Sequence, residues 1–372
     1  MGLSSIEVKK ANKNSVLRYI LATEQFSKNS VAQALDLSVP TVTQALRELQ
    51  QIGFVKEAGM LESIGGRKAM GFRCVKDFRV AVGVDITRNH VNVVIVNLAL
   101  ETLYYRRVNV CIKDEATYGD LKKVIENAIS ESGVDREKIL GLGISIPAIP
   151  DGEGRRITHI HEQMLGCKNL DQVVGTWFPY PVIFGNDADN AGRAELHCQK
   201  VEKDAVFFFV SPSVGGALIH DGEIRRGRQY RAGEFGHMIL YPKGKPCYCG
   251  RIGCVDPYCN TNVLSDHTDG SLDVFFRELK EGNEKFRKIW EEYLDYIALA
   301  IHNLLAAFDS NIIIGGYLGQ HIGPYMGELK AKIKRMDPYL EDDAFVRPAS
   351  LKYEASAIGI ASVFVEDFLN QI

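Results

Sequence analysis

The sequence lacks any hydrophobic run long enough to cross a membrane, although it is 372 residues long. Its first ten residues, M-G-L-S-S-I-E-V-K-K, also lack the apolar segment of a secretory signal. It has no strong excess of charge, because the formal net charge is −3. These absences argue against membrane and secreted classes of protein. We therefore expect a cytoplasmic protein in a compartment that keeps thiols reduced.

The charge that is present is unevenly distributed. Residues 1–75 contain ten Lys and Arg against six Asp and Glu, a charge of +4, which leaves −7 for the remaining residues. A small basic segment attached to a larger acidic body indicates that only the N-terminal segment binds a polyanion.

The same N-terminal segment has the pattern of three helices and a hairpin. Apolar residues in 14–22 share one helix face, Ser27 and Ser38 are placed to cap two further helices, and Gly53 ends the third. Two short strands around a Gly-rich loop follow. This order predicts a winged helix-turn-helix that reads DNA with its third helix, although a generic three-helix bundle is the alternative. The expected inner stripe of the third helix is Val42, Ala45, Leu46, Leu49 and Ile52. The expected DNA contacts are Thr41, Thr43, Gln44 and Arg47 on that helix and Arg67 and Lys68 in the loop.

From residue 80 onwards the pattern becomes alternating α and β. Three β-rich runs, an amphipathic helix at about 117–132 and a strand ending before Pro147 form one series. A second series begins near residue 205 and ends in a helix from about Ala355 to Leu369. Two halves, each with a β-meander followed by α and β elements, predict a duplicated α/β fold with a cleft between them.

A cysteine cluster indicates a metal site. Cys247, Cys249 and Cys254 lie downstream of His237, with glycines and a proline supplying the turns between them. Three thiolates and one imidazole form a tetrahedral set that leaves no position for a reacting water, which predicts a structural zinc site within about 237–254. Ordinary buried cysteines or a disulfide are the alternative, and Cys259 is expected to pack nearby as a free thiol.

These motifs together resemble the ROK family of repressors and sugar kinases. The resemblance rests on Asn186-Asp187-Ala188, on Glu234-x-Gly236-His237 and on the cysteine motif, and it covers essentially the whole chain. The helix-turn-helix with its G-G-R loop looks like the repressor branch of that family. The resemblance implies a winged helix-turn-helix over residues 1–76. It implies an actin-like, hexokinase-type and ribonuclease H-like sugar-binding domain over residues 77–372.

The resemblance also implies a set of sugar-binding residues. Asn186, Asp187, Glu234 and His237 match family positions that hold sugar hydroxyls, with His237 binding zinc through one ring nitrogen and facing the sugar with the other. Asp256 stands where the family has a glutamate two residues after the last zinc cysteine, so the resemblance also implies a sugar contact for this shorter side chain. For Asp187 the alternative is a turn residue that precedes a helix.

The two phosphate-binding loops of family kinases are altered here. The first aligns with Asp85-Ile86-Thr87-Arg88-Asn89-His90, where both glycines are missing, so side chains would block the approach of phosphates. The second aligns with residues 211–216, where Pro212 removes a backbone donor. Tyr317 follows Gly315-Gly316 where a small residue is usual. Asp187, which aligns with the family's catalytic base, is retained, but no kinase activity is expected without a phosphoryl donor.

The sequence therefore predicts a sugar-responsive transcriptional repressor that binds operator DNA as a homodimer, or as a tetramer of two dimers. The sugar either induces or co-represses. Two alternatives are a sugar kinase with a DNA-binding segment and a zinc-stabilised sugar-binding protein with a vestigial N-terminal segment.

Overall fold

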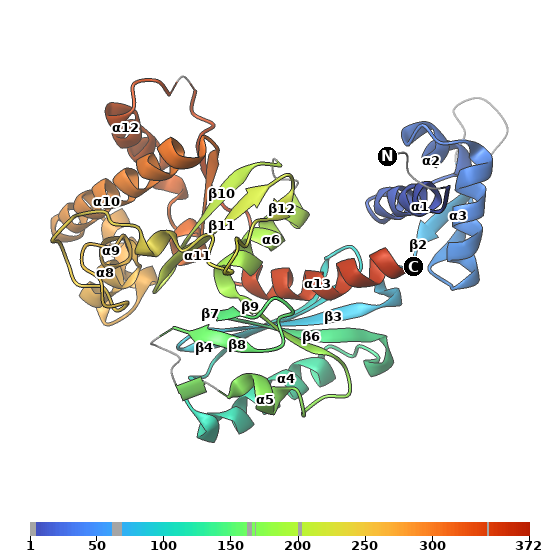
Figure 1. Cartoon of the computed structure of the whole chain (residues 1–372), viewed down its shortest axis with the longest axis horizontal. Helices are drawn as coiled ribbons and strands as arrows, with labels where there is room; N and C mark the ends of the chain where they lie inside the picture. The colour runs from blue at the N-terminus through green and yellow to red at the C-terminus, as the bar shows by residue number, and fades with distance from the viewer. Residues whose placement is uncertain (1–4, 62–68, 162–165, 168, 200–202, 341) are drawn as a thin grey trace.

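The computed structural model describes residues 5–61, 69–161, 166–167, 169–199, 203–340 and 342–372. A small helical unit, here called the head, lies beside the C-terminal end of the last helix (Figure 1). The remainder forms two larger units that each contain a sheet. No helix in the described residues is both long and apolar enough to cross a membrane.

The head has three helices and a hairpin, in the order expected from the sequence. Its elements are α1 (Ser5–Leu21), α2 (Lys28–Ala34), α3 (Val39–Gln51), β1 (Val55–Met60) and β2 (Met70–Cys74). The Ser27 hydroxyl accepts from Ser30 N at 3.0 Å, and the Ser38 hydroxyl accepts from Thr41 N at 3.3 Å. Both serines thus act as N-caps, which satisfies backbone donors that a helix end leaves unpaired.

The structure corrects one residue of the expected inner stripe of α3. Val42, Ala45, Leu46 and Leu49 are buried, but the Ile52 side chain is 46% exposed. Ile52 is the C-cap of α3 and Gly53 has φ +82°, so the chain leaves the helix before residue 52 reaches the core face. The loop with Arg67 and Lys68 lies outside the described residues.

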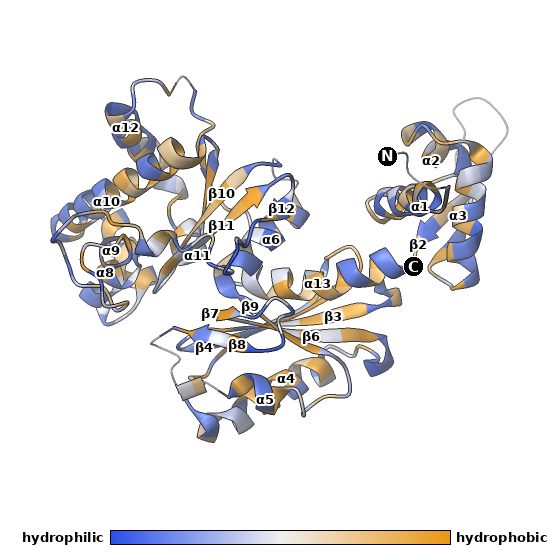
Figure 2. Cartoon of the chain, viewed as in Figure 1, coloured by the Kyte–Doolittle hydropathy of each residue, from blue (hydrophilic) through white to orange (hydrophobic). Residues whose placement is uncertain are grey.

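The first half of the body is a five-stranded sheet with helices α4 and α5 on one face. Strand order is β5-β4-β3-β6-β9, with β3, β4 and β5 antiparallel and β6 and β9 parallel to β3. Figure 2 shows the hydrophobic colour along β3 and β6, as expected for strands buried on both faces. Its elements are β3 (Val80–Ile86), β4 (His90–Asn97), β5 (Thr102–Asn109), α4 (Tyr118–Glu131), β6 (Ile139–Ile146), β7 (Ala148–Pro150), β8 (Ile157–Ile160), α5 (Leu170–Val174) and β9 (Val182–Asn186).

The second half repeats this topology. Its strand order is β12-β11-β10-β13-β14, with the first three antiparallel and the last two parallel, so the predicted duplication is confirmed. Its main elements are α6 (Asp187–Gln199), β10 (Ala205–Val210), β11 (Val214–His220), β12 (Glu223–Ile224), α7 (Asp256–Cys259), α8 (Asn262–Ser265), α9 (Leu272–Lys280), α10 (Glu284–Phe308), β13 (Asn311–Gly315), α11 (Gly316–Gly319), α12 (Met326–Met336), β14 (Val346–Pro348) and α13 (Ala355–Gln371).

Helix α13 returns from the second half and packs on the first sheet, where it also contacts α6. Glycine makes the close approach possible, because a Cβ on Gly359 would lie 1.7 Å from Asn190 O and one on Gly83 would lie 1.9 Å from Ala357 O. One hydrophobic core joins the head to α13 and to strands β3 and β4. Phe78 bridges them, since its ring contacts Phe54 of the head and Phe368 of α13 at 6.0 and 6.3 Å between centroids.

Candidate functional site

A cavity of about 850 Å³ lies between the two halves of the body. Its lining comes from β8, from the junction of β9 with α6, from β11, and from the chain between residues 230 and 251. Asn186, Asp187, Glu234 and His237 all line it, so the structure brings these four predicted residues together. A cavity of this size with a few convergent polar groups is typical of a small-molecule site.

Asn186 and Asp187 reach the cavity because β9 ends and α6 begins between them. Asn186 donates its amide to Ala148 O at 3.2 Å and accepts from Asp189 N at 3.0 Å, which fixes its orientation. The Asp187 carboxylate accepts from Ala188 N at 3.0 Å. Burial raises the pKa of Asp187 to about 6 and that of Asp189 to about 7. Hydroxyl groups of a ligand in the cavity could donate to these carboxylates.

Glu234 is the N-cap of the short 3-10 helix η5 (Phe235–His237), and His237 is its last residue. Glycine at position 236 is required there, since a Cβ would meet Val214 O at 2.0 Å. Glu234 Oε2 lies 3.8 Å from His237 Nε2, and burial raises the pKa of the Glu234 carboxyl while lowering that of the His237 ring. The Nε2 atom of His237 thus faces the cavity and the carboxylate of Glu234.

The other ring nitrogen faces the cysteines. His237 Nδ1 lies 3.8 Å from Cys247 Sγ, and the Sγ atoms of Cys249 and Cys254 lie 3.8 Å apart. The four candidate ligand atoms all lie within 4.8 Å of one another, so these residues could hold a metal ion. Gly250 and Gly253 have φ of +83° and +82°, which lets the chain turn back between the thiols. Cys259 is fully buried beside this loop, as expected.

Tyr248 and His161, two aromatic residues that the sequence did not single out, connect residues 237–254, here called the metal loop, to the first half of the body. The Tyr248 hydroxyl lies 3.2 Å from His237 Nε2, and its ring meets that of His161 at 4.2 Å between centroids. Burial, with the nearby His237, lowers the pKa of His161 to about 4. His161 follows β8 while Tyr248 lies in the metal loop, so no sequence spacing connects them. Their contact closes one side of the cavity.

Asp256 differs from its predicted role as a sugar ligand. It is buried and does not line the cavity. Its carboxylate accepts from Val214 N at 2.7 Å and from the Asn260 amide at 3.2 Å. Both oxygens are therefore used to anchor the start of β11 and α7, and we do not retain Asp256 as a sugar ligand.

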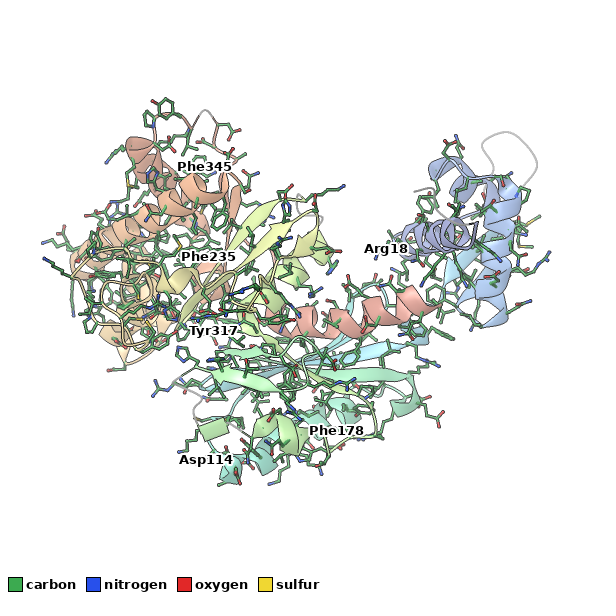
Figure 3. The ribbon with its side chains drawn as sticks, in the orientation of Figure 1. Arg18, Asp114, Phe178, Phe235, Tyr317 and Phe345 are labelled. Atoms are coloured by element: carbon green, nitrogen blue, oxygen red, sulfur yellow. The ribbon has the colours of Figure 1, made fainter. Side chains whose placement is uncertain are left out.

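Three side chains from the two halves of the body pack against one another near residues 85–90 and 211–216. The Arg107 guanidinium of β5 lies 3.6 Å from the Tyr353 ring centre and 5.5 Å from that of Tyr317. The two tyrosine rings meet edge to face at 5.2 Å. Figure 3 shows Tyr317 between the two halves of the body. We call Arg107, Tyr317 and Tyr353 the interlobe cluster, because it ties β5 of the first half to α11 of the second.

Internal partners occupy several polar groups of residues 85–90 and 211–216. Tyr317 N donates to Ser211 Oγ at 3.3 Å, and the Tyr317 side chain hydrogen-bonds with Thr87. Ser211 N donates to Ser213 O at 3.0 Å. Asp85 is buried and accepts from the Asn92 amide at 3.0 Å, and burial raises its pKa to about 7.

The residues expected to contact DNA lie on the N-terminal part of α3. Gln44 and Arg47 are exposed, whereas Thr41 and Thr43 are half-buried. The Gln44 amide donates to Glu48 Oε1 at 3.0 Å, and Glu48 also pairs with Lys13 at 3.0 Å. Arg47 is therefore the predicted residue of α3 whose charged group is most available to a ligand.

Comparison with known proteins agrees with this architecture. The ROK family model matches residues 81–367. The xylose repressor of Caldicellulosiruptor bescii is 23% identical, over 98% of this chain and 97% of its own length. A crystal structure of a ROK family transcriptional regulator, a homologue of the E. coli MLC protein, superposes with a TM-score of 0.75 at 19% identity, covering 98% of this chain and 97% of that one.

Family kinases share the body but not the head. The ROK hexokinase of Thermus thermophilus superposes with a TM-score of 0.61 at 24% identity, covering 77% of this chain and 99% of its own. A likeness at this level shows the fold alone, and the fold hosts more than one function. The match over residues 81–367, which includes both sheets and the cavity, shows that the chain belongs to the ROK family.

Proposed function

We propose that the protein is a sugar-responsive, DNA-binding transcriptional repressor of carbohydrate metabolism genes. The observation that carries this proposal is the shared core between the head and α13, because α13 also packs on the first sheet and on α6, whose first residue lines the cavity. The head over residues 1–76 would bind operator DNA in the cytoplasm, and the body over residues 77–372 would bind the sugar. A repressor relative matched over almost the full length supports this division.

The assignment of roles within the cavity follows its geometry. Asn186, Asp187, Glu234 and His237 would hold sugar hydroxyls, because they offer amide and imidazole donors beside carboxylate acceptors. Closure of the two halves around the sugar would move α13 and so change the angle of the head. For release of DNA, the sugar must bind the DNA-incompetent state more tightly, whereas the opposite preference would make it a co-repressor.

A homodimer would place two heads on adjacent half-sites about 34 Å apart along the DNA. A tetramer of two dimers is the alternative assembly, which light scattering on the DNA-bound protein would distinguish.

Zinc is the proposed metal at His237, Cys247, Cys249 and Cys254. Two sulfurs that each lie about 2.3 Å from one zinc in tetrahedral geometry are about 3.8 Å apart. This is the separation of the Cys249 and Cys254 sulfurs. Because four protein ligands fill a tetrahedral ion, the zinc would be structural. It would also fix the His237 ring, so that Nε2 stays directed at the cavity.

Measurement of DNA binding tests this function directly. Fluorescence anisotropy with DNA from the protein's own promoter region should show tight binding that at least one sugar weakens by about fivefold or more. An Arg47→Ala variant should bind that DNA about tenfold more weakly, since one base contact contributes roughly 1–3 kcal/mol. The control Arg335→Ala removes an exposed charge from α12, far from the head, and should leave binding unchanged. Equal binding by wild type and Arg47→Ala would remove α3 from the proposed interface.

Mg-ATP should produce no thermal shift and no sugar-dependent ADP in this protein. Residues 85–90 lack the two glycines of the family loop, Pro212 removes a backbone donor from the second loop, and Tyr317 N is already bonded to Ser211 Oγ. A ligand at 100 times its Kd would add about 2.7 kcal/mol to stability, which a thermal shift detects. The Thermus thermophilus ROK hexokinase is the positive control. ATP-dependent sugar phosphorylation would establish the alternative, a sugar kinase with a DNA-binding head.

A further inference from the structure

The cavity has two chemically different regions. Its inner wall carries Asn186, Asp187 and Glu234, the groups suited to hydroxyls. Arg231, Arg251 and His159 also line the cavity, but these three side chains are exposed, which places them at its mouth. A neutral monosaccharide would use the inner wall and leave the three basic groups of the mouth without a counterpart.

The three basic groups converge from separate parts of the chain. Arg231 lies in the loop before η5, Arg251 lies in the metal loop and His159 lies in β8 of the other half. Although burial raises the pKa of the Glu234 carboxyl, the charges of Arg231, Arg251 and His159 each act to lower it. All three line the same cavity as Glu234. Positive charges gathered at the mouth of a cavity attract an anion and raise its local concentration.

Among the described residues, the two arginines of this group, Arg231 and Arg251, form no close ion pair with a carboxylate. Arg226, on the same loop as Arg231, differs because it lies 3.9 Å from Asp189. Arg251 hydrogen-bonds to the Cys249 sulfur, which leaves Arg231 as the guanidinium most available to a ligand.

The backbone holds the Arg231 loop in place. Tyr230 adopts φ +55° and Gly233 adopts φ +93°, where a Cβ would meet Gly216 O at 2.1 Å. Ala232 N donates to Arg226 O at 3.1 Å across the loop. The Tyr230 hydroxyl lies against Gly152 in the turn between β7 and β8, since a Cβ on that glycine would be 2.3 Å from it. A loop fixed at both ends loses little entropy when it binds a ligand.

We infer that the effector is an anionic sugar, and that Arg231, with Arg251 and His159, binds its phosphate or carboxylate at the mouth of the cavity while the inner wall holds its hydroxyls. This inference rests on the proposed function, because it takes the cavity as the effector site. Arg231 is then the residue that determines specificity for charge, since guanidinium groups bind phosphate and carboxylate oxygens through paired N–H donors.

Calorimetry with matched ligand pairs tests the inference on the full-length, zinc-loaded protein. The pairs are xylose, glucose, mannose and N-acetylglucosamine, each with its terminal phosphate ester, together with glucuronate and inorganic phosphate. At least one anionic sugar should bind about tenfold or more tightly than its neutral parent, and this advantage should shrink as salt rises. The phosphate esters and glucuronate distinguish the two kinds of anion.

Variants of the loop that carries Arg231 show which residue makes the anionic sugar bind more tightly. Arg231→Gln should bring the ratio of the affinities for the anionic sugar and its neutral parent down to about one, whereas Arg231→Lys should retain part of the advantage. Arg228→Gln is the matched control, because Arg228 is exposed on the same loop but does not line the cavity. Equal affinity for neutral and anionic partners would overturn the inference and leave the proposed function standing. If no sugar of either kind bound, the effector function itself would be wrong.

Discussion

Replacing Cys254 by serine is expected to remove the bound zinc and to lower the melting temperature by about 6 °C. Cys254 is fully buried, and its sulfur lies 3.8 Å from that of Cys249, so the remaining three ligands could not complete the coordination. Losing a structural metal costs roughly 3 kcal/mol or more, and 1 kcal/mol corresponds to about 2 °C in a large domain. Elemental analysis and calorimetry would measure both effects.

The matched control is Cys111→Ser, which changes an exposed thiol outside the metal cluster. This variant should keep one zinc per chain and have the melting temperature of the wild type. Chelation of the wild type should reproduce the Cys254→Ser result, and it should also weaken sugar binding because His237 loses its fixed ring orientation. A Cys254→Ser protein that retained zinc and stability would show that the cluster is not a metal site.

Replacing Asp187 by asparagine is expected to weaken sugar binding by about 100-fold while DNA binding stays intact. A carboxylate that accepts hydroxyl hydrogen bonds inside a buried site contributes roughly 1.5–3 kcal/mol for each charge-assisted bond. Asparagine has the same shape, and its oxygen keeps the bond from Ala188 N, so the fold should survive. Calorimetry would measure the sugar affinity. In the DNA-binding assay, the sugar should no longer release the variant from DNA.

The pH dependence of sugar affinity gives a second measure of this role. Because burial raises the pKa of Asp187 to about 6, its carboxylate predominates above that pH and is lost below it. Sugar affinity should therefore be steady above pH 7 and fall up to tenfold per pH unit below 6, with a smaller fall in Asp187→Asn. Asp120→Asn, an exposed change on α4, is the control. Undiminished affinity in Asp187→Asn would reduce Asp187 to the alternative role of a helix-starting residue.

Local features of the fold could be predicted because their causes lie within a few residues. Ser27 and Ser38 were recognisable as N-caps, and both bond to a backbone N–H three residues later. The metal loop was recognisable because its three thiols lie within eight residues, with glycines at the turns. Strand alternation and the repeated meander gave the duplicated sheet, since the period of a strand is a local property.

Predictions that depended on the end of an element were less secure. Ile52 continued the apolar stripe of α3 in the sequence, yet the left-handed turn at Gly53 exposes it. Asp256 stood at a family position for sugar contact, yet its carboxylate lies within 2.7 Å of Val214 N and is used there. A side chain one methylene shorter than glutamate changes which groups it can reach.

The sequence by itself determined the His/Cys cluster that could hold a metal, the helix caps, the duplicated topology and the residues of the inner wall of the cavity, because each depends on spacing along one stretch of chain. Only the tertiary structure decided that Tyr248 meets His161, that Arg107 lies on Tyr353, and that Arg231, Arg251 and His159 line one cavity. These partners are separated by up to 246 residues. Contacts between such distant residues arise when α13 returns to the first sheet and the two halves close on each other, and no local pattern encodes that packing.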